Sequence, residues 1–538
     1  EWSRLIAAVA TLSHLTGILG SYFRKEINRP SLRLLIFQII SCLMIFLLIA
    51  REQQEAGYMR FTELSRLVIT AGLIAIPTLM SLTRIFEWLV GKQKKGRPLM
   101  APAMQFVASL GVVILAGTGL LLLPNSTYPG ITLSFTDALF TSTSAVCVTG
   151  LNAVDFAHTF TPLGEMFTLA LIQIGGFGIM TFAYFVAMVA GQGFSLRDRV
   201  LLTDLLDEDN LGAVVSFITT IVVSTLFIEL CGAVLLYFSW EGKDINLMGE
   251  PLWWHSLFHS VSAFCNAGFD ILGRTDSLYP SLTAYAADPL VNIVIMLLII
   301  VGGIGFLTWD DVCTHGLHLR RYRMQSKVIL SATALLITIP AFLFYLTDFA
   351  DLPVGERILA SLFQSVTPRT AGYNTVDLTE MTDASQAVTI LLMLTGGAPG
   401  STAGGMKVTT LAVLIANAIA AFRRREDLQL FHRRLETSTV RNAAAILLLY
   451  LGLTFAGAAV ISTAEELPLG ACLYETASAA GTVGLTLGLT PQLGVLSQSI
   501  LILLMYFGRV GGLTLIYAAF SGHDLTYARY PQEKITVG

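Results

Sequence analysis

Charge is scarce in this sequence. Of its 538 residues, only 13% are charged and 54% are hydrophobic, whereas soluble domains carry about 25% charged residues. The net charge of −4 gives no sign of a nucleic-acid partner. This balance excludes a soluble domain of ordinary composition, and no nucleic acid is expected among the partners of the chain.

Cysteine is scarce as well, and so are the clusters that catalysis needs. The six cysteines are scattered and no two form a CxxC pair, so neither a disulfide framework nor a zinc site is expected. His255 and His259 are four residues apart, which suits a metal, but no third ligand is in sight and a structural role is favoured. No nucleophile or group of catalytic carboxylates stands within the apolar runs. We expect no enzyme activity, no organic cofactor and no metal other than a transported ion.

Long apolar runs, by contrast, are abundant. Examples are residues 31–50, 104–124, 215–239, 291–308 and 443–461. A helix needs roughly 20 apolar residues to cross a bilayer core of about 30 Å. The predicted fold class is therefore an all-α, polytopic protein of the cytoplasmic membrane, surrounded by membrane lipid.

One short pattern recurs four times. "CNAGFD" at residues 265–270 has three relatives: "CVTGLNAVD" at 147–155, "RTAGYNTVD" at 369–377 and "GTVGLTLGL" at 481–489. In each copy a glycine follows two small or β-branched residues, and these glycines stand about 110 residues apart. They are Gly150, Gly268, Gly372 and Gly484.

The surroundings of each glycine repeat too. An apolar run and a short helical pattern of small residues precede it, and a second apolar run with a glycine cluster follows. The sequence thus predicts four pseudo-symmetric units of span, pore helix, filter and span around one central pore. The units are residues 100–195, 196–325, 326–425 and 426–538.

Additional N-terminal transmembrane helices are expected in residues 1–99. Apolar stretches at 2–23, 31–50 and 61–90 provide about three of them. Residue 1 is Glu rather than Met, and an even number of helices before the first unit would require one more ahead of it. A packing or biogenesis role is favoured for this segment.

Basic loops between the units set their orientation, because cytoplasmic loops carry an excess of Lys and Arg. The linkers within units are acidic or neutral, so all four glycine segments are expected to enter from outside. The loops determine topology first, and docking of a cytoplasmic partner stays open. Their cationic residues are Lys92, Lys94, Lys95, Arg97, Arg197, Arg199, Arg320, Arg321, Arg323, Lys327, Arg423, Arg424, Arg425, Arg433, Arg434 and Arg441.

The four glycine segments are predicted to form an ion filter. Non-helical backbone at membrane depth is tolerated where it is buried or lines a wet cavity, and rings of carbonyls can replace the hydration shell of a cation. A single copy would be explained equally well by a turn or a packing glycine, whereas four matching copies favour the filter. Its predicted residues are Val148, Thr149, Gly150, Asn266, Ala267, Gly268, Thr370, Ala371, Gly372, Thr482, Val483 and Gly484.

Several motifs give the chain a resemblance to the Trk/Ktr/HKT superfamily of potassium transporters over roughly residues 104–538. They are "TSAVCVTGL", "HSVSAFCNAGF", "SVTPRTAGYNTVD", "ASAAGTVGLTLGLTP" and "FGRVGGLTL", and the ending "YPQEKITVG" looks most like the Ktr-type membrane subunit. The resemblance implies a homodimer with one pore per subunit and a cytoplasmic, RCK-type nucleotide-binding regulatory ring. In the HKT branch, serine at the first filter glycine goes with sodium permeation, so Gly150 favours potassium.

The third unit departs from the other three. "TGGAPGSTAGGMK" brings Pro399, Ser401, Thr402 and extra glycines to a place where the other units are expected to continue as helix. The resemblance implies that this loop is a gate below the filter. A soluble phosphate-binding loop is excluded, because no GK[ST] follows and no strand precedes. The predicted gate residues are Gly396, Gly397, Gly400, Ser401, Thr402, Gly404, Gly405 and Arg509.

Two ionisable residues stand within predicted spans. By the resemblance, Arg509 projects into the pore beneath the filter, where its charge would hinder cations; the alternative is an arginine that reaches the membrane surface. Glu229 needs a partner or water, and Arg369 is a candidate.

The expected function is potassium-selective uptake through a filter, gated by the loop and by a cytoplasmic nucleotide-binding regulatory subunit, with dependence on sodium ion left open. An alternating-access cation/proton symporter or other membrane carrier is the alternative. A carrier of two inverted repeats would alternate the orientation of its repeats, whereas all four glycine segments here face one side. A receptor or structural role leaves the filter pattern unexplained.

Overall fold

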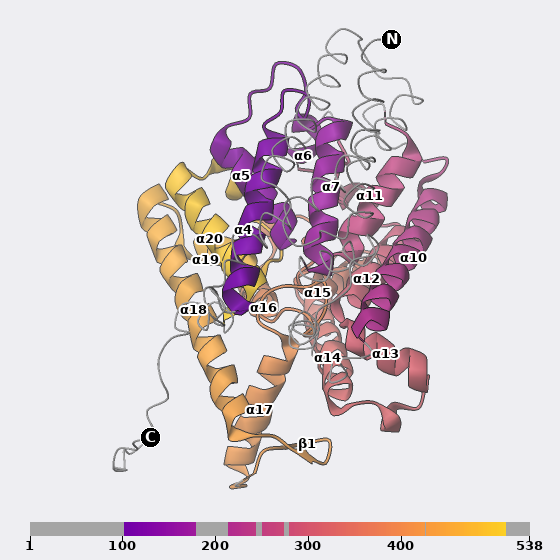
Figure 1. Ribbon diagram of the computed structural model, residues 1–538, viewed down its shortest axis with the longest axis vertical. Helices are drawn as coiled ribbons and strands as arrows, with labels where there is room; N and C mark the ends of the chain where they lie inside the picture. The colour runs from indigo at the N-terminus through magenta and orange to yellow at the C-terminus, as the bar shows by residue number, and fades with distance from the viewer. Residues whose placement is uncertain (1–101, 179–213, 244–249, 274–278, 426, 513–538) are drawn as a thin grey trace, which may run out of the picture.

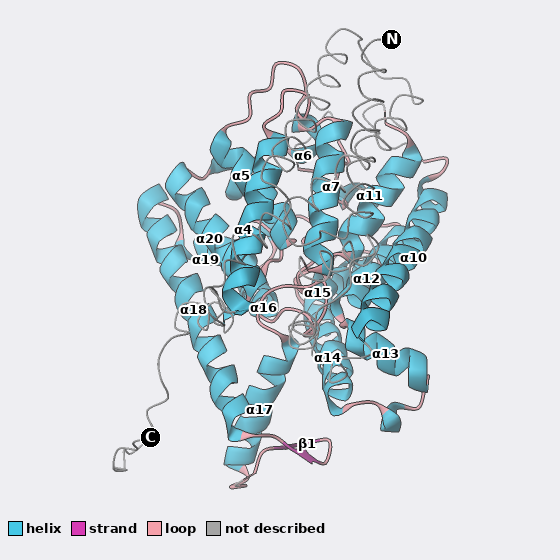
Figure 2. Ribbon diagram, viewed as in Figure 1, coloured by secondary structure: helices cyan, strands magenta, loops and turns pink. Residues whose placement is uncertain are grey.

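Helices make up nearly all of the part of the chain that the structure describes. The computed structural model describes residues 102–178, 214–243, 250–273, 279–425 and 427–512 (Figure 1). The helices expected in residues 1–99 lie outside these ranges. Figure 2 shows helices throughout this part and a single short hairpin, formed by β1 (Gln429–Leu430) and β2 (Arg433–Arg434). The all-α fold class is confirmed.

The helices fall into four groups that repeat one order: a long helix, a short pore helix and a second long helix. The first group holds α4 (Pro102–Leu121), α5 (Phe135–Cys147), α6 (Phe156–Thr159) and α7 (Pro162–Phe177). The second holds α10 (Val214–Trp240), α11 (Leu252–Phe264), η1 (Thr283–Tyr285), α12 (Pro289–Gly303), α13 (Phe306–His315) and η2 (Leu319–Arg321).

The third and fourth groups follow the same plan. The third holds α14 (Met324–Leu346), α15 (Val354–Val366), η3 (Leu378–Glu380), α16 (Asp383–Leu394) and α17 (Val408–Phe422). The fourth holds α18 (Thr437–Glu465), α19 (Leu469–Gly481), η4 (Thr490–Gln492) and α20 (Val495–Val510). In the order above, α5, α11, α15 and α19 are the pore helices.

Local signals in the sequence fix where the second long helices begin. Thr161 caps α7 by accepting from the amide of Gly164, and Asp288 caps α12 by accepting from the amides of Leu290 and Val291. A proline follows each cap, at a position where the helix needs no amide proton. These starts therefore follow from residues close together in the sequence.

Packing closes the four groups into a ring. In every group the first helix packs on its own pore helix: α4 on α5, α10 on α11, α14 on α15 and α18 on α19. The second long helix of each group packs on the pore helix of the next group: α7 on α11, α12 on α15, α16 on α19 and α20 on α5. Because the last contact returns to the first group, the groups surround one axis, as the repeats predicted.

Burial follows this arrangement. The pore helices lie at the centre, and α5 from Phe140 to Cys147 and α19 from Tyr474 to Gly481 are buried at every position. The outer helix α10 instead exposes large apolar side chains, among them Phe227 and Phe238. An apolar exterior around a centre rich in Ser, Thr and Ala is the arrangement expected of a protein with a bilayer around it.

Three helices of the described part are each long and apolar enough to cross a membrane: α10, α14 and α18. The pair α12 and α13 passes the same test together, but the two are bent by 99° at their junction. The shorter apolar helices α7, α16, α17 and α20 have between 10 and 17 residues. The second helix of each group therefore ends after 12 to 16 residues: α7, α12, α16 and α20 have 16, 15, 12 and 16.

These early helix ends correct one expectation from the sequence. Helix was expected to continue through the glycine clusters of the first, second and fourth units, but α7 ends at Phe177, α12 at Gly303 and α20 at Val510. Gly178, Gly305 and Gly511 follow with φ of 80°, 87° and 85° and ψ of 130°, 144° and 135°. Residues with a side chain rarely adopt this conformation, so the helix stops there. From composition alone, an apolar run that contains glycines could equally be one continuous membrane-spanning helix.

Candidate functional site

An extended segment follows each pore helix, and its backbone alternates in handedness. Left-handed residues come in pairs separated by one residue: Val148 and Gly150, Asn266 and Gly268, Thr370 and Gly372, Thr482 and Gly484. The φ values run from 52° to 71° at the first member and from 68° to 95° at the glycine. Thr149, Ala267, Ala371 and Val483, between the members, keep the ordinary negative φ.

Hydrogen bonds show which way this backbone faces. The amides of Val148, Thr149 and Gly150 donate back to the pore helix, to Ala145 O, Ser144 O and Ser144 Oγ at 3.1, 2.8 and 3.0 Å. Because N–H and C=O point in opposite directions across a trans peptide bond, the carbonyls of residues 147–149 face away from the pore helix.

The fourth unit repeats this pattern atom for atom. The amides of Thr482, Val483 and Gly484 donate to Ala479 O, Ser478 O and Ser478 Oγ at 3.1, 2.8 and 3.0 Å. In the second unit, Asn266 and Ala267 donate to Ala263 O and Ser262 O, and Ser262 Oγ accepts from the amide of Phe269. In the third, Ala371 donates to Thr367 O. Each filter segment is thus anchored by its amides and leaves carbonyls unused.

The four glycines meet around the axis. A Cβ atom placed on Gly150 would lie 2.4 Å from Ala267 O, and one on Gly268 would lie 2.6 Å from Ala371 O. One on Gly372 would lie 2.4 Å from Val483 O, and one on Gly484 would lie 2.3 Å from Thr149 O. Each glycine therefore faces the carbonyl of the residue that precedes the next glycine, and the series closes on itself.

The four glycines and the four residues that precede them, eight of the twelve predicted filter residues, thus lie in one ring. The left-handed conformation of Val148, Thr370 and Thr482 is unfavourable by about 1–2 kcal/mol per residue, because the Cβ crowds the following carbonyl. Such backbone persists where the surroundings determine it and is common at functional sites. The sequence identified the four glycines, but it gave no reason to expect a left-handed residue two positions before each of them.

Several supporting residues were missed in the sequence. Ser144 and Ser478, six residues before their glycines, fix the filter amides, and "TSTSAV" and "ETASAA" show a serine at the same offset. Glu475, buried in α19, accepts from Thr490 Oγ1 at 2.7 Å, from the amide of Leu487 at 3.2 Å and from Thr486 Oγ1. The sequence did contain a signal for this contact: a carboxylate, Glu475, in a predicted pore helix, and two threonines, Thr486 and Thr490, in the segment that follows the fourth glycine.

The loop of the third unit lies directly beneath this ring. Between α16 and α17 the chain turns back on itself, and the amide of Gly396 donates to Met406 O at 2.7 Å. A Cβ on Gly404 would lie 2.1 Å from Thr482 Oγ1, and one on Gly405 would lie 2.8 Å from Gly481 O. The loop therefore contacts the filter segment of the fourth unit.

The loop is also held by the second unit and by its own lysine. Thr402 Oγ1 donates to Phe264 O at 3.1 Å, and the amide of Ala398 donates to Gly303 O at 2.9 Å. Lys407 Nζ donates to Ala403 O at 2.8 Å and to Gly404 O at 3.3 Å. Lys407, which the sequence analysis did not single out, thus holds two carbonyls of the loop together.

Arg509 joins the loop to the first unit. Its guanidinium donates to the carbonyl of Thr402 in the loop and to the carbonyl of Gly175 near the end of α7. Both acceptors lie at the level where the second long helices are interrupted. An arginine that reached the membrane surface would direct its guanidinium outward, and this one is directed inward. The side chain lies between two units, below the filter.

Two further expectations have definite outcomes. The partner of Glu229 is Gln173, whose Nε2 lies 3.1 and 3.2 Å from the two carboxylate oxygens, and Arg369 instead donates to Thr333 Oγ1 at 3.1 Å. The pairing of Glu229 with Arg369 is therefore wrong, because Arg369 lies against the first helix of its own unit.

The two histidines have contacts within the protein. His259 Nδ1 lies 2.8 Å from His255 O, and the His259 ring packs at right angles on Trp240. His255 Nε2 lies 3.5 Å from Glu250 Oε2. These contacts agree with the structural role that the sequence favoured for both rings.

Comparison with known proteins agrees with this geometry. The chain matches the family described as TrkH, cation transport protein, over residues 66–524. It is 36% identical to the "Ktr system potassium uptake protein B" of Bacillus subtilis (strain 168) over 438 residues, which cover 79% of this chain and 94% of that protein. It is also 36% identical to the "Potassium/sodium uptake protein NtpJ" of Enterococcus hirae over 461 residues, which cover 83% of this chain and 99% of that protein.

A solved structure has the same fold. The potassium transporter TrkH from Vibrio parahaemolyticus superposes with a TM-score of 0.62 and covers 96% of this chain and 97% of its own. The two sequences are 18% identical, so this likeness concerns the fold alone.

Proposed function

The chain belongs to the TrkH family of cation transport proteins and is a multi-pass protein of the cytoplasmic membrane, and from this premise we propose that it is a potassium uptake protein. Potassium ions pass through the ring of filter carbonyls, and the 395–407 loop with Arg509 controls their passage. Relatives named as potassium uptake proteins, at 36% and 35% identity, support potassium as the ion. The proposal assigns potassium as cargo and no organic cofactor.

The observation that carries the proposal is the closed series of four glycines and four carbonyls. An ion that leaves water must exchange its hydration shell for oxygen atoms, and the ring offers carbonyls from all four units. The alternation of left-handed and ordinary backbone conformation along each segment also supports an ion filter, because it lets consecutive carbonyls face one side. A packing role for one glycine would not require the neighbouring unit to present a carbonyl to it.

An alternating-access carrier is the second candidate. In inverted-repeat carriers, the halves of the chain have opposite orientations and the binding site lies at their interface. Here the four groups repeat one helix order and pack head to tail around an axis. That arrangement favours the filter.

The proposed function is tested in a bacterial host that lacks its own potassium uptake. We expect the chain to restore growth at low potassium and to take up rubidium as a substitute. Parallel cultures with and without sodium test sodium dependence, since one relative is named as a potassium/sodium uptake protein. If a chain that reaches the membrane restores no growth at any potassium concentration, the proposal is wrong.

Two assemblies are part of the proposal. By the resemblance of the motifs, two copies of the chain form a homodimer, and a cytoplasmic nucleotide-binding ring regulates it. The "Ktr system" named for two relatives supports a second component. The mass of the purified complex, measured by light scattering with and without that component, tests both.

Shortening the loop is expected to raise ion flux. The loop lies against Thr482 and Gly481, at the inner end of the filter, so deleting residues 400–403 should open the path below. Uptake at saturating potassium, divided by the amount of protein in the membrane, should increase severalfold. The matched control is Gly400→Asn, because a Cβ there meets no atom within 4 Å, asparagine tolerates the left-handed φ of 61°, and the loop keeps its length. A deletion variant that transported no faster would make the loop a packing element.

A further inference from the structure

The cytoplasmic end of α14 carries a basic hollow that the transport pathway does not use. The hollow, of about 280 Å³, is lined by residues of two segments about 105 residues apart in sequence. The first segment runs from η2 into the start of α14, and the second is the β1–β2 hairpin. The lining residues are Arg320, Arg321, Tyr322, Arg323, Met324, Lys327, Phe431 and Arg433.

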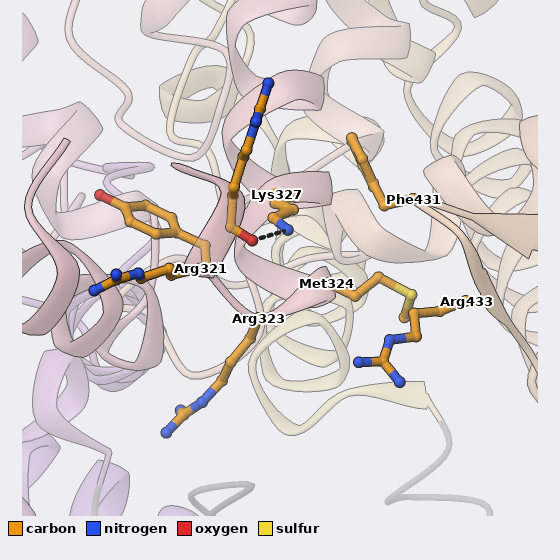
Figure 3. A pocket seen from close by; sticks show the side chains of 8 residues that line it. Arg321, Arg323, Met324, Lys327, Phe431 and Arg433 are labelled. Atoms are coloured by element: carbon orange, nitrogen blue, oxygen red, sulfur yellow. Dashed lines mark hydrogen bonds between the residues drawn. The ribbon is translucent and has the colours of Figure 1, made fainter. Parts of the chain in front are cut away.

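Five cations line this hollow, and two of them, Lys327 and Arg433, come from different segments and have no carboxylate partner in the described ranges. In Figure 3, Phe431 and Arg433 approach from the hairpin, while Met324 and Lys327 lie on the side of α14. Lys327 Nζ donates to Arg320 O at 2.9 Å, which fixes its position. Within the described ranges, no carboxylate oxygen comes within ion-pair distance of Lys327 or Arg433, so their charge remains available to a ligand.

Two neighbouring arginines, Arg323 and Arg434, are in contrast already paired with carboxylates. Arg323 lies 3.2 Å from Asp310 and 3.9 Å from Asp311, and Figure 3 shows it directed away from the hollow. Arg434, next to Arg433 on β2, lies 2.9 Å from Asp427. The basic residues of this region therefore differ in how available their charge is: Arg323 and Arg434 are paired, whereas Lys327 and Arg433 are not.

The start of α14 adds to the positive field. α14 begins at Met324, and no side chain caps its first turn. The amides at a helix start carry partial positive charge and favour anions. Together with Lys327 and Arg433 they would bind the oxygen atoms of a phosphate group.

The hollow also lies at the depth of lipid headgroups. α14 is 23 residues long and apolar enough to cross a membrane. At 1.5 Å per residue it is about 34 Å long, close to the roughly 30 Å of a bilayer core, so we expect its first turn near the membrane surface. Exposed apolar side chains belong to the same two segments: Phe431, which lines the hollow, is 48% exposed, and Leu317 and Leu319, just before Arg320 in the chain, are 96% and 59% exposed. Cations beside exposed apolar side chains are typical of surfaces that contact anionic lipid.

We propose that this hollow binds the phosphate of an anionic phospholipid headgroup and so ties the β1–β2 hairpin of the third and fourth units to the start of α14. The lipid phosphate bridges Lys327 and Arg433, and its acyl chains lie along the apolar surface of α14. This inference is independent of the proposed ion and filter, because none of these residues belongs to the pathway.

The test compares phosphatidylglycerol with phosphatidylcholine on the delipidated, full-length protein in detergent. Bound lipid is counted by native mass spectrometry across a titration. A basic residue near an anionic surface strengthens attachment about fivefold, so the double variant Lys327→Gln/Arg433→Gln should bind phosphatidylglycerol about twenty-five-fold more weakly. The matched control Arg424→Gln/Arg434→Gln removes the same charge nearby and should bind like the parent. The charge-preserving pair Lys327→Arg/Arg433→Lys should also retain the lipid.

Three results would overturn the proposal. Equal binding of phosphatidylcholine and phosphatidylglycerol would remove the role of the anionic headgroup. Equal weakening in the control pair would show general electrostatic attraction. Retained lipid with lost binding of the cytoplasmic regulatory subunit would make the hollow a protein-docking surface. Inorganic phosphate alone, added as a competitor, should displace the lipid only weakly, because it lacks the acyl chains.

Discussion

Replacing Gly150 with serine is expected to lower the preference for potassium over sodium at least tenfold. A Cβ at this position would lie 2.4 Å from Ala267 O and 3.1 Å from the Cα of Gly268. Since ordinary contacts begin near 3.4 Å, this filter carbonyl would have to move by about 1 Å. A tenfold loss corresponds to about 1.4 kcal/mol of differential ion stabilisation, which is modest for a displaced ligand. The measurement is potassium uptake in competition with sodium, in cells or in proteoliposomes.

The control for this variant is Gly130→Ser. Gly130 has the same φ of 90° as Gly150, but a Cβ there meets no atom within 4 Å. Both substitutions therefore carry the strain of a left-handed side chain, and only one disturbs the ring. Unchanged selectivity in Gly150→Ser, in protein that reaches the membrane, would argue strongly against the filter. A shift of equal size in Gly130→Ser would attribute the effect to backbone strain.

Replacing Arg509 with alanine is expected to raise maximal potassium uptake about fivefold or more. At an effective dielectric constant of about 20, two unit charges about 4 Å apart interact by roughly 4 kcal/mol. A quarter of that repulsion, about 1 kcal/mol, already changes ion occupancy about fivefold. The substitution also removes the two hydrogen bonds that tie the loop to the first unit. Selectivity should change little, because the filter carbonyls lie above this side chain.

Two further variants separate charge from tethering. Arg509→Lys keeps the positive charge but loses the branched guanidinium that reaches both carbonyls. If the charge of Arg509 is what hinders potassium, uptake by this variant should stay close to that of the parent. Arg509→Gln keeps an amide donor and loses the charge, so the same hypothesis predicts uptake close to that of Arg509→Ala. Arg441→Ala, an exposed cytoplasmic arginine, is the control. Uptake per unit of membrane protein that stays at the parent level in Arg509→Ala would disprove both roles.

The sequence by itself determined the class of the protein and the four repeats, and it predicted which segments form the proposed filter and loop. Each of these depends on residues close together in the chain: apolar runs long enough to span a bilayer, and a glycine at one offset after a small-residue helix. Repetition made the inference secure, because a pattern that is ambiguous in one copy was read four times.

Only the tertiary structure decided which atoms these residues meet. Arg509 binds the carbonyl of Thr402, 107 residues away, and that of Gly175, 334 residues away, and no local pattern specifies such partners. Glu229 lies beside Gln173 of another unit. The same holds for the glycine clusters of α7, α12 and α20, where helix propensity opposes glycine by only about 1 kcal/mol. That bias is small enough for packing to decide whether the helix continues. Just after α12, for example, the amide of Phe306 donates to Gly400 O of the third unit at 2.8 Å, and a contact between residues so far apart in the chain leaves no local pattern in the sequence.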